Sequence, residues 1–186
     1  MSVHRFAFVL IFTALASASL LAQTHLPRKS PELTITKTSG EQVLLSSFKG
    51  KVVVIEFMFV GSPHCLRLAE MLNKVQGDLG SRGYQSIAIA FGPNSDQAMV
   101  SHVAERLALS YPVGYSTSGD VDSYLGREGS EKLKIPQMVV IDRKGLIRAA
   151  TGGGADTRLE DEAALRTLVD SLLKETASAS ASKNQP

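Results

Sequence analysis

The fold of this chain is decided by residues 52–65, which read VVVIEFMFVGSPHC. The first nine of them are apolar except for Glu56. A continuous apolar run of this kind is typical of a central strand that is buried on both faces. Pro63 then falls in the first turn of a predicted helix and Ser62 at its N-cap, positions that both residue types favour. The stretch therefore predicts a buried strand that leads directly into a helix.

Strand and helix patterns alternate on either side of this stretch. After Pro63, apolar residues recur at spacings of three and four as far as Leu79, which indicates an amphipathic helix. The other expected elements are a hairpin from Leu33 to Leu45, strands at Ser86–Phe91, Gln137–Ile141 and Leu146–Ala150, and helices at Asp96–Leu109 and Leu159–Glu175. This order predicts an α/β fold with a central mixed β-sheet flanked by helices and an N-terminal β-hairpin.

The first 22 residues have the composition of a secretory signal peptide. A weakly positive start precedes an apolar stretch at Phe6–Leu15, and cleavage after Ala18 or Ala22 satisfies the small-residue rule. The rival interpretation is a membrane anchor, but the apolar run is shorter than the roughly 20 residues that a span needs. We therefore expect an exported protein, periplasmic or secreted, without stable membrane insertion after cleavage. The expected organisation is a signal peptide at 1–22, a flexible lead at 23–32, a single domain at 33–175 and a disordered tail at 176–186.

Composition limits the partners and the chemistry. The formal net charge is +2, with 20 Lys and Arg against 18 Asp and Glu dispersed along the chain, so no nucleic-acid partner is expected. Cys65 is the only cysteine, which makes an intramolecular disulfide impossible. His64 stands beside it, but no second cysteine exists to complete a metal site. We expect no metal and no cofactor.

Cys65 is the candidate reactive group. It falls in the first turn of the predicted helix, where free backbone N–H groups and the positive end of the helix dipole stabilise a thiolate. The alternative is a small buried hydrophobic residue, which is what most isolated cysteines are. Ser62 likewise needs no role beyond beginning the helix. Position alone leaves these interpretations open.

Glu56 and Pro136 are two further candidates. A carboxylate inside an apolar strand is unfavourable unless it is paired or protonated, and a protonated carboxyl can pass protons to a nearby thiol. The alternative for Glu56 is a strand edge from which it reaches solvent or a lysine. Pro136 directly precedes a predicted strand, where proline either blocks a ladder hydrogen bond or marks a cis peptide bond.

Three separated motifs resemble the thioredoxin-like redoxins, in particular the exported TlpA-like thiol-disulfide reductases and the related alkyl hydroperoxide reductase/thiol-specific antioxidant family. The motifs are SSFKGKVVV at residues 46–54, SPHC at 62–65, and IP at 135–136 before VVIDRKG at 139–145. The resemblance covers Leu33 to Lys174 and implies a thioredoxin-like fold.

The family's active-site pattern is Cys-x-x-Cys, so the resemblance places Ser62 at the attacking cysteine and Cys65 at the resolving one. Pro63 and His64 match the Cys-Pro-His-Cys of the DsbA-like oxidases. A dithiol enzyme resolves its mixed disulfide with the second cysteine, and this chain cannot do so internally.

The resemblance also assigns places around this motif. Glu56 falls where thioredoxins have a buried acid. Pro136, after Ile135, falls where they have the cis-proline that shapes substrate binding. Gly61 replaces the usual Trp. The substrate-binding residues expected from the resemblance are Pro63, His64, Ile135 and Pro136.

The leading functional prediction is a thiol oxidoreductase whose catalytic residues are Cys65, Ser62 and Glu56. The peroxiredoxin branch has a Thr or Ser three residues before its reactive thiol, which implies oxidation of Cys65 by a peroxide to a sulfenic acid. Met58, however, stands where that branch has Pro. The expected partners are a thiol or disulfide protein substrate, or a peroxide, together with an external thiol reductant. The alternative is a degenerate member that holds an extended peptide beside Pro136 and Ser62 without turnover.

Overall fold

The computed structural model describes residues 26–127, 133–151 and 157–181. The predicted signal peptide, residues 1–22, and the last five residues of the predicted tail lie outside this part. The strands are β1 Arg28–Lys29, β2 Thr34–Lys37, β3 Gln42–Leu44, β4 Val52–Met58, β5 Tyr84–Ala90, β6 Val113–Tyr115, β7 Gln137–Ile141 and β8 Leu146–Ala150. The α-helices are α1 Pro63–Leu79, α2 Gln97–Arg106, α3 Ser118–Leu125 and α4 Glu162–Ala181, and the 3-10 helices are η1 Leu45–Phe48, η2 Gly80–Arg82 and η3 Thr157–Glu160.

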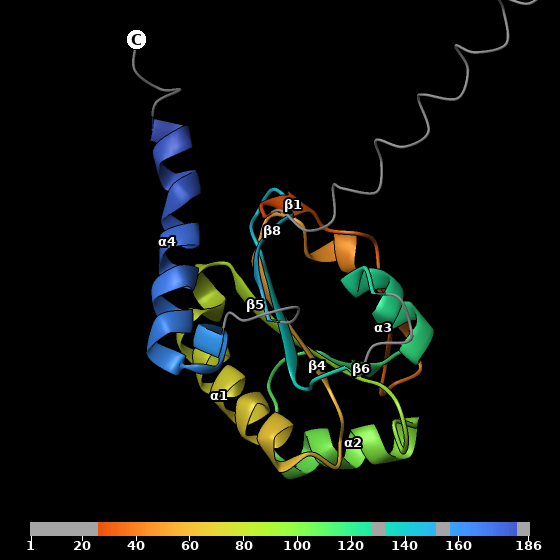
Figure 1. Cartoon of the computed structure of the whole chain (residues 1–186). Coiled ribbons are helices and arrows are strands. Elements are labelled where there is room, and N and C mark those ends of the chain that lie inside the picture. Colours follow the sequence, from red (N-terminus) through yellow and green to blue (C-terminus); the bar gives the residue numbers. More distant parts are fainter. Residues whose placement is uncertain (1–25, 128–132, 152–156, 182–186) are drawn as a thin grey trace, which may run out of the picture.

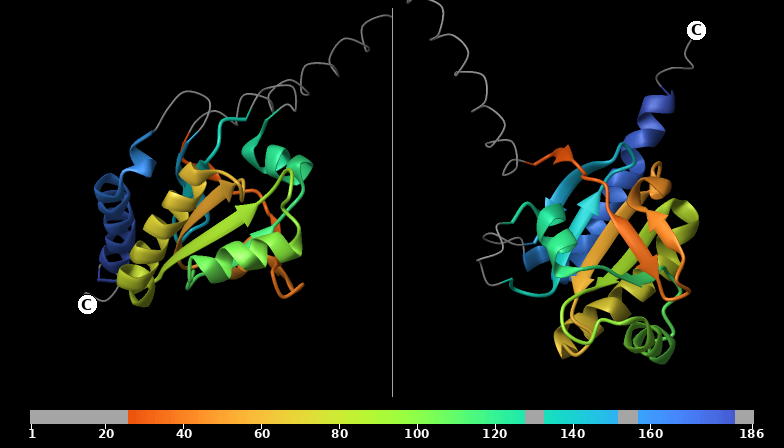
Figure 2. Two further views of the ribbon diagram at one scale, coloured as in Figure 1. Left: turned by 90° about the horizontal axis from the view of Figure 1, so that it is seen from below. Right: turned by 90° about the vertical axis from the view of Figure 1, so that its right-hand side faces the viewer.

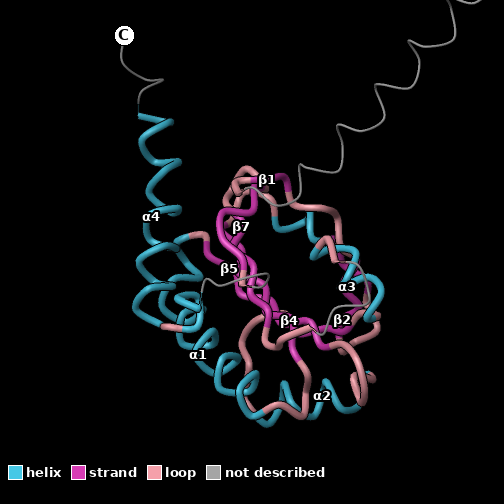
Figure 3. Tube along the Cα trace, viewed as in Figure 1, coloured by secondary structure: helices cyan, strands magenta, loops and turns pink. Residues whose placement is uncertain are grey.

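The strands form one mixed sheet in the order β1-β8-β7-β4-β5-β6-β2-β3 (Figure 3). Strand β4 pairs in parallel with β5 and antiparallel with β7. Every residue of β4 and β5 is buried, as expected of strands covered on both faces. The predicted α/β fold with a central mixed sheet is confirmed, and so is the hairpin, which β2 and β3 form.

Two apolar cores lie on the two faces of the sheet, because successive side chains of a strand point to opposite faces. Val52, Val54 and Met58 of β4 belong to the core under α1, α2 and α4. Val53 and Phe57 belong to the core under α3 and η1. Figure 1 and Figure 2 show α1 and α4 side by side on one side of the sheet and α3 on the other.

Two strands and one α-helix of the structure, β1, β6 and α3, were not predicted from the sequence. Arg28 and Lys29, inside the segment expected to be a flexible lead, pair with β8 as strand β1, so this part of the expectation is corrected. A two-residue strand between prolines carries no pattern of its own and depends on the neighbouring edge. Strand β6 has three residues and α3 has eight, both too short for a clear apolar period.

The last helix also differs from its predicted bounds of Leu159–Glu175. Its first residues form η3, and α4 continues to Ala181. The sequence analysis ended the helix early because the apolar spacing stops at Leu173, whereas alanine and serine continue a helix without such a pattern. No helix in the described ranges is long and apolar enough to cross a membrane.

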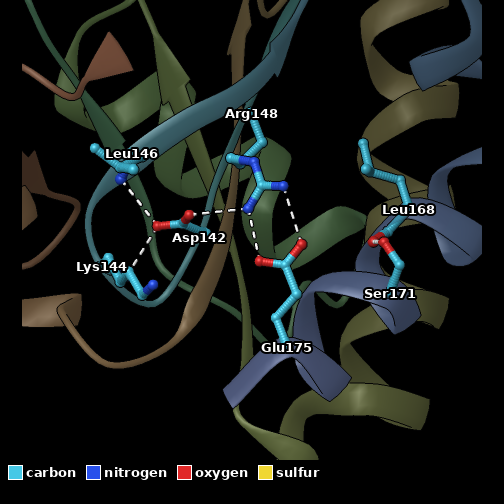
Figure 4. A network of polar contacts seen from close by, with 7 residues as sticks. All are labelled: Asp142, Lys144, Leu146, Arg148, Leu168, Ser171 and Glu175. Atoms are coloured by element: carbon cyan, nitrogen blue, oxygen red, sulfur yellow. Dashed lines mark hydrogen bonds and ion pairs between the residues drawn. The ribbon is translucent and has the colours of Figure 1, made fainter. Parts of the chain in front are cut away.

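A polar network holds α4 against the turn between β7 and β8 (Figure 4). Arg148 donates hydrogen bonds to both carboxylate oxygens of Glu175, at 2.7 and 2.9 Å, and to Asp142 Oδ2 at 3.1 Å. Asp142 Oδ1 accepts the backbone N–H groups of Lys144 and Leu146, which closes the turn. The network fixes the end of the sheet that lies opposite the start of α1.

Candidate functional site

The candidate site lies where β4 ends and α1 begins. Ser62 is the N-cap of α1, and its hydroxyl oxygen accepts the backbone N–H of Cys65 at 3.4 Å. Its own backbone N–H donates to the Phe59 carbonyl at 3.0 Å, which turns the chain out of the strand. Pro63 occupies the first helical position, where its missing N–H removes no hydrogen bond. The predicted cap and first turn are confirmed.

The thiol of Cys65 is completely buried, with 0% of the residue exposed. Burial raises the pKa of this thiol, the Ser62 hydroxyl and the Phe59 backbone lower it, and Glu56 raises it again, so that its pKa stands above the ordinary value. Cys65 packs in the core under α1, together with Met58 and Leu68. The thiol form, not the thiolate, is therefore favoured at neutral pH.

Glu56 is buried in the same core. Glu56 lies two residues after Val54 and two before Met58 on β4, so the three side chains point to the same face of the sheet. This is the face that α1 covers. It is 0% exposed, and neither carboxyl oxygen has a hydrogen-bond partner among the described residues. Desolvation holds the pKa of Glu56 well above its usual range. The alternative of a carboxylate at a strand edge, reaching solvent or a lysine, is wrong.

A second buried polar group lies near this carboxyl. The Tyr111 hydroxyl donates to the Ala69 carbonyl of α1 at 3.1 Å. Burial raises the pKa of Tyr111, and Glu56 raises it further. Tyr111 was not singled out from the sequence, because a tyrosine before a proline in a loop gives no sign of facing the core.

Ile135 and Pro136 approach the same end of β4 from β7. Phe57 pairs with Gln137, the residue after Pro136, so the loop before β7 reaches the point where β4 leads into α1. The peptide bond between Ile135 and Pro136 is cis, which agrees with one of the two alternatives for this proline. Pro136 itself is buried, whereas Ile135 is half-buried and packs against both cores.

His64 points to a partner that the sequence did not indicate. Its Nε2 lies 3.1 Å from Glu160 Oε2 of η3, and the side chains are 45% and 29% exposed. The two residues are far apart in the chain, and only the fold brings them together. In the described ranges, no three His, Cys, Asp or Glu side chains gather in a way that could hold a metal ion.

The outer surface of the site is therefore formed by exposed Pro63 and by half-buried Ser62, His64 and Ile135, which we call the α1-start face. Cys65 and Glu56 lie beneath it. The structure brings the seven residues predicted for the site to one end of β4, but it separates them into an outer and an inner layer. This layering was not visible in the sequence.

The sequence profile of the Redoxin family matches residues 26–169. The chain belongs to the Redoxin family. This redoxin is similar to the thiol-disulfide oxidoreductase ResA of Halalkalibacterium halodurans, at 26% identity over 124 residues, which are 66% of each chain. It is also similar to ResA of Bacillus thuringiensis subsp. konkukian, at 22% identity over 72% of this chain and 74% of the relative.

Solved structures show the same fold. A thiol:disulfide interchange protein of the thioredoxin family from Chlorobium tepidum matches this redoxin with a TM-score of 0.65 and 23% identity, over 80% of this chain and 98% of that one. The thioredoxin domain of a thiol-disulfide oxidoreductase from Bacteroides vulgatus matches with a TM-score of 0.62 and 20% identity, over 77% and 96%. The predicted thioredoxin-like fold is confirmed.

Proposed function

We propose that this redoxin binds cysteine-containing polypeptides in extended form at the α1-start face and does not complete a dithiol cycle of its own. Its relatives include proteins named thiol-disulfide oxidoreductases, so thiol or disulfide proteins are the partners that fit the family. All four residues of the α1-start face are at least partly open to solvent, and one of them, Ile135, directly precedes the buried Pro136.

One observation carries this proposal: the N-cap position of α1 holds a half-buried hydroxyl, while the only cysteine of the chain, Cys65, is 0% exposed behind it. A serine hydroxyl is a weak nucleophile without an adjacent base. A buried thiol with a raised pKa is a poor one too, because the thiolate is the attacking form. The geometry therefore favours holding a partner over exchanging disulfides with it.

Redox chemistry at Cys65 is the second candidate, because Glu56 and Ser62 both act on this thiol. In that case the Cys65 thiolate attacks one sulfur of a substrate disulfide, and the other sulfur leaves as a thiolate. An external thiol then attacks the mixed disulfide, which releases Cys65 and carries the disulfide away. With a peroxide, Cys65 takes one oxygen as a sulfenic acid, water or an alcohol leaves, and external thiols reduce it. Both routes require the first turn of α1 to open.

A peptide titration of the wild type and of Cys65→Ser tests whether binding depends on the thiol. The reduced and alkylated insulin B chain is titrated into isotope-labelled protein, and the amide shifts of residues 61–66 and 133–137 are followed. Binding by the wild type that persists in Cys65→Ser supports partner binding. Loss of binding in Cys65→Ser, or no binding at all, overturns it.

A gain-of-function variant separates binding from chemistry. Ser62→Cys places a second thiol at the half-buried N-cap of α1, three residues before Cys65. We expect the wild type to leave insulin disulfides intact in the presence of dithiothreitol and Ser62→Cys to accelerate their reduction. The double variant Ser62→Cys/Cys65→Ser is the matched control, because it keeps the thiol at position 62 without its resolving partner. Insulin reduction by the wild type would favour the redox candidate.

The proposal also includes export of the protein from the cytoplasm. The apolar stretch Phe6–Leu15 and the small residues after it support removal of an N-terminal signal peptide during secretion. Expression of the full chain with its first 22 residues, followed by mass measurement of the mature protein, tests this. A mature N-terminus after Ala18 or Ala22 supports export, and an uncleaved chain in the cytoplasm contradicts it.

A further inference from the structure

A cavity of about 540 Å³ lies at the end of the sheet opposite the candidate site. It is bounded by β1, by η1, by the first residues of β4 and by the turn between β7 and β8. Figure 1 shows β1 at the top of the view and the start of α1 at the bottom. The seven residues of β4 separate the two sites by roughly 20 Å, at the usual rise of a strand.

The floor of this cavity is apolar. Leu45, Val53 and Ile141 line it and are buried in the core under α3 and η1, and half-buried Phe48 packs against them. Ligand pockets in proteins have volumes of about 300–1,000 Å³ and mostly apolar walls with a few polar groups. The cavity therefore has the size and the lining for the body of a small organic molecule.

Four lysines surround the apolar floor: Lys29, Lys49, Lys51 and Lys144, all exposed at the rim. Lys51 donates to Gln85 Oε1 at 3.0 Å. The side-chain ammonium groups of the other three form no hydrogen bond or ion pair with any residue that the structure describes. Lys29 lies in β1, Lys49 directly follows η1, and Lys144 lies in the turn between β7 and β8. Their ammonium groups can therefore approach one ligand from several sides of the cavity.

The two acidic residues in the lining, Glu32 and Asp142, offset only part of the lysine charge. Glu32 Oε1 accepts the backbone N–H groups of Leu33 and Ser46. Asp142 accepts backbone N–H groups of the turn and pairs with Arg148 at 3.1 Å. Four lysines face these two carboxylates, and Asp142 is already paired with Arg148, so the lining keeps a net positive charge.

We propose that this cavity binds a small organic anion with an apolar body, of the class of a medium-chain carboxylate. The apolar chain lies on Leu45, Phe48 and Val53, and the carboxylate meets the ammonium groups of Lys29, Lys49 and Lys144. This site is independent of the binding proposed at the α1-start face, because it shares no residue with it.

Decanoate is the test ligand, with decanol as its neutral counterpart. Isotope-labelled protein is titrated with each, and the amide shifts report where binding occurs. We expect decanoate to shift amides around Val53, Ile141 and Gly145 with saturation, and decanol to bind more weakly at the same place. Shifts confined to the α1-start face, shifts spread over the whole chain, or none at all overturn the proposal.

Charge variants test the role of the rim. Lys29→Gln, Lys49→Gln and Lys144→Gln are combined, and the affinity for decanoate should fall on the order of tenfold, since each exposed charge contributes only weakly. The matched control neutralises three exposed cations elsewhere, by Arg67→Gln, Lys74→Gln and Arg106→Gln together, and should leave the affinity within about twofold. Equal losses in the two variants would mean that net charge alone acts, and an unchanged affinity in the rim variant contradicts the site.

Discussion

The carboxyl group of Glu56 and the thiol of Cys65 lie on the same face of the sheet, and neither is exposed to solvent. Each is held by burial in the form that carries no charge, since desolvation raises both pKa values. Glu56 also acts on Cys65 directly, because a negative charge at Glu56 disfavours the thiolate. In the inner layer of the site, burial therefore disfavours the charged forms of both the carboxyl and the thiol.

The first prediction concerns stability against pH. Because folding raises the pKa of Glu56 above its ordinary value of 4.5, the unfolded chain releases this proton at lower pH than the folded protein does. Stability from this group is fully present below pH 4.5 and is lost as pH rises toward the folded pKa. Relative to Glu56→Gln, the free energy of unfolding of the wild type should decline by about 1.4 kcal/mol per pH unit in that window.

Urea unfolding at a series of pH values from 4 to 9 measures this difference. Glu56→Leu is the second variant, because it lacks the unpaired amide that glutamine would bury. Parallel curves for the wild type and both variants would show that Glu56 titrates normally in the folded protein.

The second prediction concerns the cap of α1. Ser62→Ala removes the acceptor of the Cys65 N–H, and loss of an N-cap hydroxyl costs about 1 kcal/mol of stability. The Ser62 hydroxyl also lowers the pKa of Cys65, so the thiol pKa should rise further in this variant. Chemical denaturation gives the first quantity and the pH dependence of thiol absorbance in the ultraviolet gives the second.

A matched control exists at another helix. Asp96 caps α2 and accepts the Met99 N–H at 2.9 Å, far from the thiol in the chain. Asp96→Ala should lower stability by a similar amount and leave the thiol pKa unchanged. An equal shift of the thiol pKa in both variants would mean that general loosening, not the Ser62 hydroxyl, sets it.

The third prediction concerns His64 and Glu160. With side chains 45% and 29% exposed, this pair should contribute no more than about 1 kcal/mol. A double-mutant cycle with His64→Gln and Glu160→Gln measures the coupling, which should shrink as salt is added. A coupling that is unaffected by salt would contradict an ion pair between these two side chains.

Much of the fold could be predicted from the sequence, because its central elements carry strong local patterns. The apolar run that becomes β4 and the Ser-Pro start of α1 each specify their own structure. Strand β1 could not be predicted in this way, since Arg28 and Lys29 are polar and become a strand only by pairing with β8. Strand β6 contains Gly114, where a Cβ would lie 2.6 Å from the Thr36 carbonyl oxygen. Packing against Thr36 therefore requires glycine at this position, and no local sequence pattern indicates that requirement.

The sequence predicted which residues form the candidate site better than it predicted how they are arranged. Cys65 and Glu56 stand out as a lone thiol and a lone acid among apolar residues. Whether they face each other depends on the strand's alternation and on how α1 packs, which only the folded protein shows. The contact between His64 and Glu160 leaves no local signal at all, because it joins α1 to η3 across the fold.

The rate of alkylation of Cys65 by iodoacetamide, measured against pH on the purified folded protein, tests the central claim most directly. With the thiol buried and its pKa raised, we expect slow modification at neutral pH and complete modification once the protein is unfolded in urea. Rapid alkylation of the folded protein at neutral pH, with trapping of a sulfenic acid after peroxide treatment, would contradict the account and establish Cys65 as a redox thiol.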